Sequence, residues 1–191
     1  MEKLQRWKVR IGRSVGAVAF ATAIGVAAPA QAGLGDQRFI CDDFVKVATV
    51  LGQGFIFEGA SAFEFSGRRF TMVQEDGSVR SGRFRVKGAR IQLTPNRGTL
   101  NLVVRETAAL LEQGFLDFGV VADLTLRLEN SVLVAVIGPD GGFGFRGRYR
   151  IRVTGTVDGR AVTTRFVLNE TATCRPEILL PALDAPVPFN P

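Results

Sequence analysis

Arginine occupies every second position in part of one short stretch of the sequence, FGFRGRYRIRV, residues 143–153. In an extended strand, side chains two residues apart lie on the same face, so these arginines would form one charged face. The guanidinium group suits the planar oxygens of carboxylates, sulfates and phosphates. The stretch therefore predicts either a surface that binds an anion or the solvated face of an ordinary strand. The four arginines are Arg146, Arg148, Arg150 and Arg152.

A hairpin would bring a fifth arginine to this face. Asp158-Gly159 is typical of a two-residue hairpin turn, and the run RAVTTRFVL follows it directly. If these two residues form the turn, Ile151 pairs with Phe166 and Arg152 pairs with Arg165. Apolar side chains then share one face and the arginines share the other, whereas a slip of one residue would pair core with solvent.

Charge repulsion within this face does not decide between the two interpretations. Side chains two positions apart on a strand are separated by about 6.8 Å, and two unit charges at that distance in water repel by roughly 0.6 kcal/mol. A solvated face, partly neutralised by acids on a neighbouring strand, therefore needs no ligand and is the simpler interpretation. As the functional alternative, the five arginines would bind an acidic polysaccharide, a lipid headgroup or an acidic protein.

The run VLVAVI, residues 132–137, is apolar at every position. We predict Asn130-Ser131 as a turn before it, which would pair the run with LTLRLE, residues 124–129, and leave three valines on the opposite face. A strand that is apolar on both faces needs a cover. The chain's own helix or proline-rich tail would supply it, with an interface between subunits as the alternative. The three valines are Val132, Val134 and Val136.

The most restrictive chemical feature of the sequence is that it contains no histidine. This removes the Ser-His-Asp triad, the commonest metal ligand and the usual proton carrier near neutral pH. The sequence also lacks a cluster of metal ligands and a serine-nucleophile motif, and its acidic residues are not spaced as an acid–base pair. We therefore expect no catalytic residues, no metal and no cofactor, and a protein that acts by binding.

Residues 1–32 have the pattern of a secretion signal peptide. A basic start is followed by an apolar run over 15–28 and then by Ala30-Gln31-Ala32, a typical cleavage site. Five of the 24 basic residues and one of the 18 acidic residues lie in this segment, so the remaining chain carries a net charge near +2. That small excess does not favour nucleic-acid binding. We expect a periplasmic or secreted protein that begins at Gly33 and keeps no transmembrane segment.

Cys41 and Cys174 are the two cysteines of the chain. In an oxidising compartment an even pair most simply forms one disulfide. Two buried thiols are the alternative. If the bridge forms, it closes a loop of most of the predicted domain, which the chain-entropy model credits with roughly 4 to 5 kcal/mol of stability.

From residue 55 onward, apolar and polar residues alternate and turn residues recur at short intervals. This pattern predicts one all-β domain over residues 33–175, an antiparallel barrel or sandwich of about 8 to 10 strands. Its alternation resembles that of lipocalin-like barrels at the level of architecture. One or two short helices are expected, at residues 42–51 and within 100–113. Residues 176–191, which include five prolines, are predicted as an extended tail.

Two functions follow from this fold. In the first, the protein is a non-catalytic binding or structural component of a bacterial envelope, and either the arginine face or the valine face docks a partner. In the second, it is a lipocalin-like carrier of a small apolar ligand, held in a barrel interior lined by phenylalanine. An interior cavity of ligand size would favour the carrier, and a filled core with an exposed arginine or valine patch would favour the docking protein.

Overall fold

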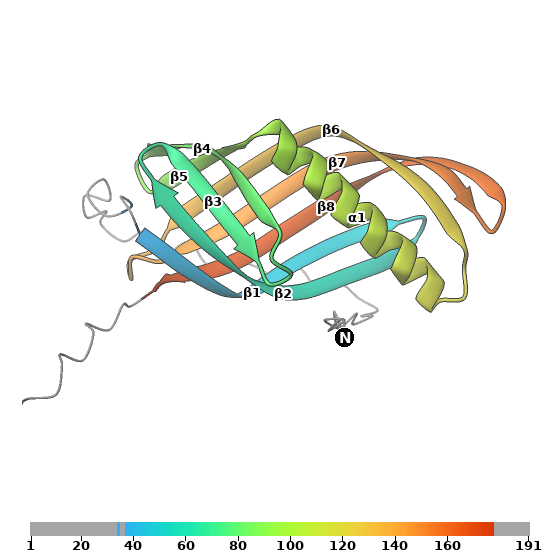
Figure 1. The fold of residues 1–191 in the computed structure, drawn as a ribbon, viewed down its shortest axis with the longest axis horizontal. Helices are drawn as coiled ribbons and strands as arrows, with labels where there is room; N and C mark the ends of the chain where they lie inside the picture. Colours follow the sequence, from blue (N-terminus) through green and yellow to red (C-terminus); the bar gives the residue numbers. More distant parts are fainter. Residues whose placement is uncertain (1–33, 35–36, 178–191) are drawn as a thin grey trace, which may run out of the picture.

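The computed structural model describes residue 34 and residues 37–177 (Figure 1). The predicted signal peptide lies entirely outside the described residues, and so does the predicted tail from residue 178 onward.

Eight antiparallel strands form a closed barrel, in which each strand pairs with the next along the chain and β8 pairs with β1. This confirms the predicted all-β architecture and selects a barrel over a sandwich. The elements in chain order are β1 (Gln37–Val50), β2 (Gln53–Ser66), β3 (Arg69–Gln74), β4 (Val79–Lys87), β5 (Arg90–Pro95), α1 (Arg97–Asp117), β6 (Ala122–Ile137), β7 (Phe143–Val157) and β8 (Arg160–Pro176).

The strands differ greatly in length, and the helix compensates for the difference. β1, β2, β6, β7 and β8 have 14 to 17 residues, whereas β3, β4 and β5 have 6 to 9. The short β5 pairs with β6 only over Arg90–Leu93 and Leu133–Val136. Beyond the short strands, α1 runs along the wall beside β6 (Figure 1). The helix thus takes the place of strand pairing in that half of the barrel.

α1 is held to the barrel by a stripe at every fourth residue and by a cap. The side chain of Asn96 accepts a hydrogen bond from the Thr99 amide, as expected of a helix N-cap. At the other end, Gly114 faces the Phe55 ring of β2 so closely that a Cβ there would lie 2.7 Å from a ring carbon. The helix confirms the prediction made within 100–113. Its buried stripe is Thr99, Val103, Thr107, Leu111 and Phe115.

The helix predicted at residues 42–51 is wrong, because this segment belongs to β1. The spacing of Phe44, Val47, Ala48 and Leu51 fits a helical face, but β1 pairs with β2 on one side and with β8 on the other. Pairing on both sides of a strand outweighs such weak local preferences.

The turn predicted at Asn130-Ser131 is also wrong, because β6 runs through these residues without interruption. A β-bulge lies between Leu128 and Asn130. The extra residue shifts the alternation from even to odd positions, so that Leu124 before the bulge and Leu133 after it both point inward. The change of phase that suggested two paired strands is therefore a bulge within one strand.

Phenylalanine fills the end of the barrel that contains the disulfide. Phe39 packs edge-on against Phe143 with ring centroids 4.9 Å apart, and Phe63 lies 5.3 Å from the same ring. Phe65 lies 5.8 Å from Phe39 and is equally buried. Such edge-to-face pairs stabilise a core beyond the area that they bury. Among the described residues, no helix has the length and apolar character needed to cross a membrane.

Candidate functional site: an arginine wall outside and a charged cluster inside

The predicted hairpin of β7 and β8 is present in the predicted register. Asp158 and Gly159 form the turn with positive φ angles of 48° and 73°, the combination that a two-residue hairpin turn requires. Ile151 lies opposite Phe166, and Arg152 lies opposite Arg165. Ile151 and Phe166 are buried, and all five arginines of the predicted face are exposed.

A sixth arginine extends this face onto β6. Arg127 is exposed and lies opposite Arg152, so Arg127, Arg152 and Arg165 form a row across three neighbouring strands. Arg127 was not among the predicted residues of this face, because the turn predicted at Asn130-Ser131 paired LTLRLE with VLVAVI instead of with β7. A prediction that paired β6 with β7 would have placed Arg127 on this face. We call the outer surface of β6, β7 and β8 the arginine wall.

One carboxylate on the arginine wall is paired. Glu129 occupies the bulge of β6, and its Oε1 accepts a hydrogen bond of 2.8 Å from Nε of Arg165. This hydrogen bond lowers the pKa of Glu129 and raises the pKa of Arg165. The expectation that a neighbouring strand partly neutralises the face is thereby confirmed. An open hollow of about 340 Å³ lies here, lined by Glu129, Arg150, Arg165, Phe166 and Val167.

The valine strand belongs to the same wall. After the bulge, Val132 lies opposite Arg148 and Val134 lies opposite Arg146. Val132 is 55% exposed and Val136 is 52% exposed, whereas Val134 is half-buried. The prediction that the chain's own helix covers this strand is therefore wrong for Val132 and Val136. The proline-rich tail from residue 178 lies outside the described residues, and a cover by a second subunit stays a prediction.

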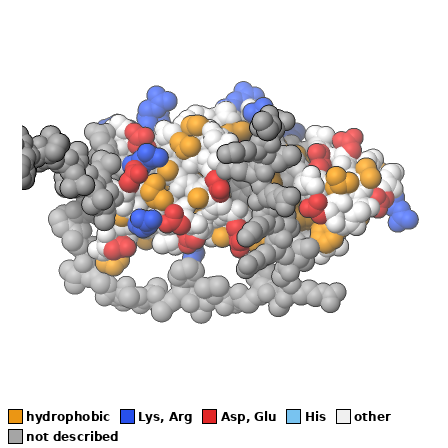
Figure 2. Space-filling view, turned by 60° about the horizontal axis from the view of Figure 1, so that its bottom comes forward, with side chains coloured by type: hydrophobic (Ala, Val, Ile, Leu, Met, Phe, Trp, Pro, Cys, Tyr) orange, Lys and Arg blue, Asp and Glu red, His pale blue; other side chains and the backbone are white. Residues whose placement is uncertain are grey.

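The neighbouring strands on the far side of β8 carry a different charge pattern. The exposed charges of β1 and β2 include Asp42, Asp43, Glu58 and Glu64, with Arg38 at the start of β1. Figure 2 brings forward the lower side of Figure 1, and acidic side chains are spread along its length. The arginine wall differs from β1 and β2, because its eight exposed arginines, which include Arg160 and Arg175 at the ends of β8, face only two exposed carboxylates, Asp123 and Glu129. Exposed cations also continue onto β3, β4 and β5, which contain no acidic residue.

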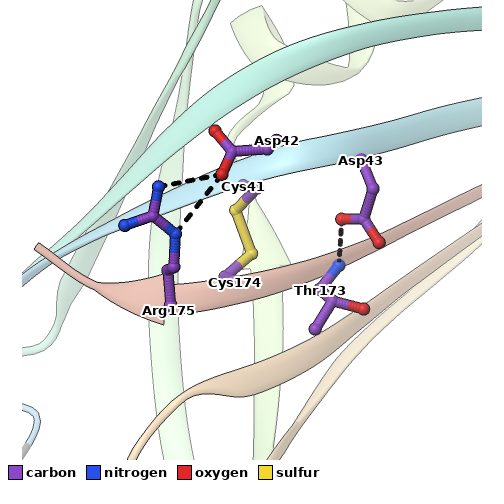
Figure 3. The surroundings of a disulfide bond; sticks show 6 residues. All are labelled: Cys41, Asp42, Asp43, Thr173, Cys174 and Arg175. Atoms are coloured by element: carbon purple, nitrogen blue, oxygen red, sulfur yellow. Dashed lines mark hydrogen bonds and ion pairs between the residues drawn. A yellow bond between two sulfur atoms is a disulfide. The ribbon is translucent and has the colours of Figure 1, made fainter.

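The disulfide predicted between Cys41 and Cys174 is present (Figure 3). The two cysteines lie directly opposite each other on β1 and β8, and both are buried. Beside them β1 bulges, and a carboxylate oxygen of Asp43 accepts a 2.7 Å hydrogen bond from the Thr173 amide. The bridge spans 133 residues of sequence, so it links the first strand of the barrel to the last.

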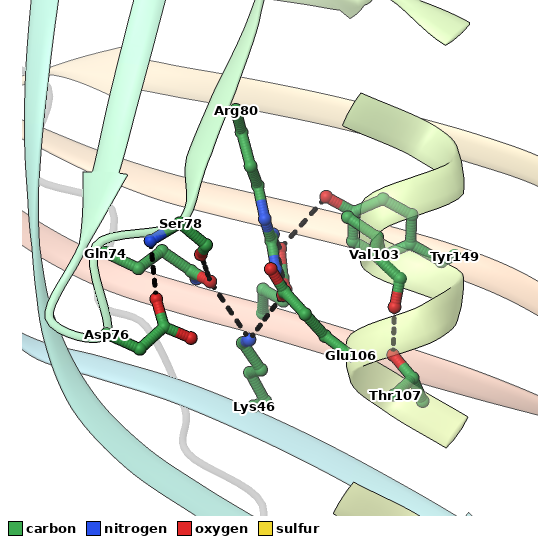
Figure 4. A network of polar contacts seen from close by, with 10 residues as sticks. Lys46, Gln74, Asp76, Ser78, Arg80, Val103, Glu106, Thr107 and Tyr149 are labelled. Atoms are coloured by element: carbon green, nitrogen blue, oxygen red, sulfur yellow. Dashed lines mark hydrogen bonds and ion pairs between the residues drawn. The ribbon is translucent and has the colours of Figure 1, made fainter. Parts of the chain in front are cut away.

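A cluster of buried charged side chains, which was not predicted from the sequence, occupies the middle of the barrel. Arg80 of β4 donates hydrogen bonds to both carboxylate oxygens of Glu170, at 2.9 and 3.0 Å, and a 2.5 Å hydrogen bond to Glu106 of α1. Lys46 of β1 lies 3.3 Å from the same Glu106 oxygen. We call these residues, together with Gln74 and Tyr149, the inner cluster (Figure 4).

The charges of the inner cluster balance, with two cations against two carboxylates. Glu170 is completely buried, and Arg80 is 2% exposed. The hydroxyl of Tyr149 donates a 2.9 Å hydrogen bond to Glu170. One signal could have found Glu170: the inward alternation of Phe166 and Leu168, continued two residues along β8, reaches it.

Burial shifts the pKa values of the cluster in directions that follow its charges. Burial lowers the pKa of Lys46, and nearby Arg80 lowers it further. Burial raises the pKa of Tyr149 well above its ordinary value, and the negative charge of Glu170 adds to this rise. Two carboxylates and a tyrosine outweigh the desolvation of Arg80 and raise the pKa of its guanidinium. Arg80 is therefore always charged, and Tyr149 is held as a neutral hydrogen-bond donor.

The inner cluster is a structural network of ion pairs and hydrogen bonds, and it also contains polar atoms that this network leaves without a partner. Among the described residues, four buried polar atoms here or beside it have no hydrogen-bond partner: Ser61 Oγ, Gln74 Nε2, Arg80 Nε and Glu106 Oε1. Donors and acceptors of this kind could hold water or another small polar molecule. The described residues contain no group of His, Cys, Asp and Glu arranged to bind a metal ion.

No family model, no curated protein and no solved structure matches this chain.

Proposed function

We propose that this protein is an exported, non-catalytic binding protein that docks an anionic partner through the arginine wall. The observation that carries the proposal is the row of Arg127, Arg152 and Arg165 across three strands. Like charges directly opposite each other destabilise a sheet, and the row contains two such pairs. An anion that binds across the row would remove this repulsion.

The arrangement of the wall supports binding of an extended anion. The arginines follow β7 from residue 146 to 152, a distance of roughly 20 Å, and the row of three crosses it. The hollow at Arg150 and Arg165 is open to solvent. An extended chain or surface that carries repeated anionic groups can contact many of these arginines at once, whereas a single small anion can contact only a few.

The alternative, a carrier of a small apolar ligand, has less support. Phenylalanine rings occupy the interior near the disulfide, with centroids about 5 to 6 Å apart, and the inner cluster occupies its middle. A ligand inside the barrel would have to displace rings or separate buried charges, and both are costly.

Retention on a column of immobilised heparin tests the proposal. We expect the protein without residues 1–32 to be retained at low salt and released as salt rises, because salt screens the charges. The double variant Arg150→Gln and Arg152→Gln should elute with little or no retention. The matched control is Arg68→Gln with Arg69→Gln, which removes the same charge from two exposed residues at the β2–β3 turn and should elute like the parent.

Two results would refute anion binding by the wall: no retention of the parent at low salt, or equal retention of the parent and the Arg150/Arg152 variant. Export is tested separately, by the intact mass of protein purified from its native host. We expect a chain that begins at Gly33 and has lost the two hydrogens of a disulfide. A retained leader would exclude the predicted processing without affecting the charge experiment.

A further inference from the structure

We propose that the anionic partner is the surface of a phospholipid membrane, and that Val132 and Val136 contact it beside the arginines. This inference rests on the proposed function and names the partner of the same wall. It starts from one observation: the two surfaces that the sequence suggested separately, the arginine ladder and the valine strand, are neighbours on β6 and β7.

Cations lie on both neighbouring strands of the valine strand, opposite different valines. On β7, Arg148 lies opposite Val132 and Arg146 lies opposite Val134. On the other side, Arg90 of β5 lies opposite Val136 and is exposed. Val132 and Val136, both more than half exposed, are separated along the strand by about 13 Å. The result is a stripe of apolar side chains flanked by positive charge.

A lipid surface is the anionic partner that makes use of both features. Arginines near a bilayer are attracted to anionic headgroups, and apolar side chains gain by entering the boundary between headgroups and acyl chains. A soluble acidic polysaccharide would engage the arginines but would gain nothing from the valines. The valines therefore favour lipid over polysaccharide.

Two protein partners fit the stripe less well. A symmetric dimer through this face would place the arginines of one copy against those of the other, because a two-fold interface joins the same patch to itself. A different rigid protein would need shape complementarity and buried anchor residues, typically tryptophan, tyrosine and arginine. The stripe lies on the outside of a barrel, which is convex, and its apolar residues are valines. A fluid surface adapts to such a shape.

The test compares vesicles with a soluble polyanion. Flotation is measured with vesicles of phosphatidylcholine alone and with vesicles that also contain phosphatidylglycerol, and retention is measured on heparin. We expect the parent to float with the phosphatidylglycerol vesicles and not with phosphatidylcholine alone. The double variant Val132→Thr and Val136→Thr keeps β-branched side chains that suit a strand. It should bind the anionic vesicles about ten-fold more weakly, because two apolar contacts are lost, and should stay on heparin like the parent.

Two further variants calibrate the result. Val73→Thr with Val79→Thr changes another exposed valine pair, on β3 and β4, and should bind vesicles like the parent. Arg150→Gln with Arg152→Gln should bind neither the anionic vesicles nor heparin. Circular dichroism and thermal melting confirm that each variant is folded.

Three results would overturn the lipid inference. If the parent is retained on heparin but does not float, the anion-binding function stands and the membrane partner falls. If the Val132/Val136 variant floats like the parent, the valines do not contact lipid. If light scattering shows a dimer that this variant converts to a monomer, a second copy covers the stripe. If the parent binds neither the anionic vesicles nor heparin, the proposed function itself is refuted.

Discussion

The inner cluster and the arginine wall place the same side chain in opposite surroundings. Arg80 is buried and forms ion pairs with two carboxylates, Glu106 and Glu170, while Lys46 supplies a second cation to Glu106. Arg152 is exposed and lies between two further arginines. A buried charge must be paired because an uncompensated one costs several kcal/mol, whereas water and salt screen an exposed charge. Pairing is thus required inside the barrel, whereas the outer surface can keep an excess of positive charge.

The cluster also explains how the barrel is assembled from unequal parts. Its six residues come from β1, β3, β4, α1, β7 and β8. Glu106 is the contribution of the helix, and it joins Arg80 and Lys46 at a single carboxylate oxygen. α1 replaces strand pairing on one side of the barrel, and this contact adds a second specific attachment to the hydrogen bonds between Thr99 and the backbone of Ser81.

The largest expected effect tests the requirement for pairing inside the barrel. Arg80→Met removes the cation that neutralises Glu170 and Glu106, and methionine keeps much of the apolar volume. We expect the free energy of unfolding, measured in urea, to fall by about 3 to 5 kcal/mol because two carboxylates stay buried with only Lys46 to balance them. The matched control is Arg83→Met on the exposed face of the same strand, which should change stability by no more than about 0.5 kcal/mol. Equal losses of stability at both positions would contradict the claim that only the buried arginine must be paired.

The next prediction uses the single tyrosine of the chain. Tyr149 is completely buried, and its pKa is raised well above 10. The folded state therefore keeps its proton where the unfolded state loses it, so the free energy of unfolding should fall as pH rises above about 10. Lys46 acts in the opposite direction: its lowered pKa means that the folded state releases a proton first and gains stability with pH up to about 10.5.

The absorbance of tyrosinate separates the contribution of Tyr149 to the pH dependence of stability from that of Lys46. No other tyrosine is present, so the signal reports Tyr149 alone, and we expect it to appear only together with unfolding. Tyr149→Phe should lose about 1 to 2 kcal/mol at neutral pH, because Glu170 loses a buried donor, and should show no loss of stability due to tyrosine ionisation. Tyrosinate absorbance that rises near pH 10 while the circular dichroism stays native would contradict the buried position.

A feature of this barrel could be predicted from the sequence when the residues that indicate it lie close together in the chain. The β7–β8 hairpin followed from its turn and from alternation over a few residues, and its register was correct. The bulge at Glu129 was missed because a change of phase within one strand and a turn between two strands leave the same pattern. Arg127 was lost with it.

The inner cluster could not be predicted for a different reason. Its members are far apart in sequence, with Arg80 and Glu170 separated by 90 positions. Alternation along one strand can mark Glu170 as inward-facing, but it does not show which buried partner neutralises the charge. Only the closure of the barrel brings the members of the cluster together. The same holds for the pairing of the arginine ladder with the valine strand, which depends on the register of β6 against β7.

The smallest expected effect tests the excess charge outside the barrel. Arg152 lies directly opposite Arg127 and Arg165, so Arg152→Gln removes two unfavourable cross-strand pairs and keeps a side chain of similar length. We expect the melting temperature at low salt to rise by about 1 °C, and the difference to disappear at high salt as the repulsion is screened. Arg175→Gln is the control. Arg175 is also exposed, but it lies 3.0 Å from the carboxylate of Asp42. Loss of the Arg175 charge should leave the melting temperature unchanged or slightly lower. A lower melting temperature for Arg152→Gln would mean that the row stabilises the sheet, and the repulsion that motivates anion binding would then be absent.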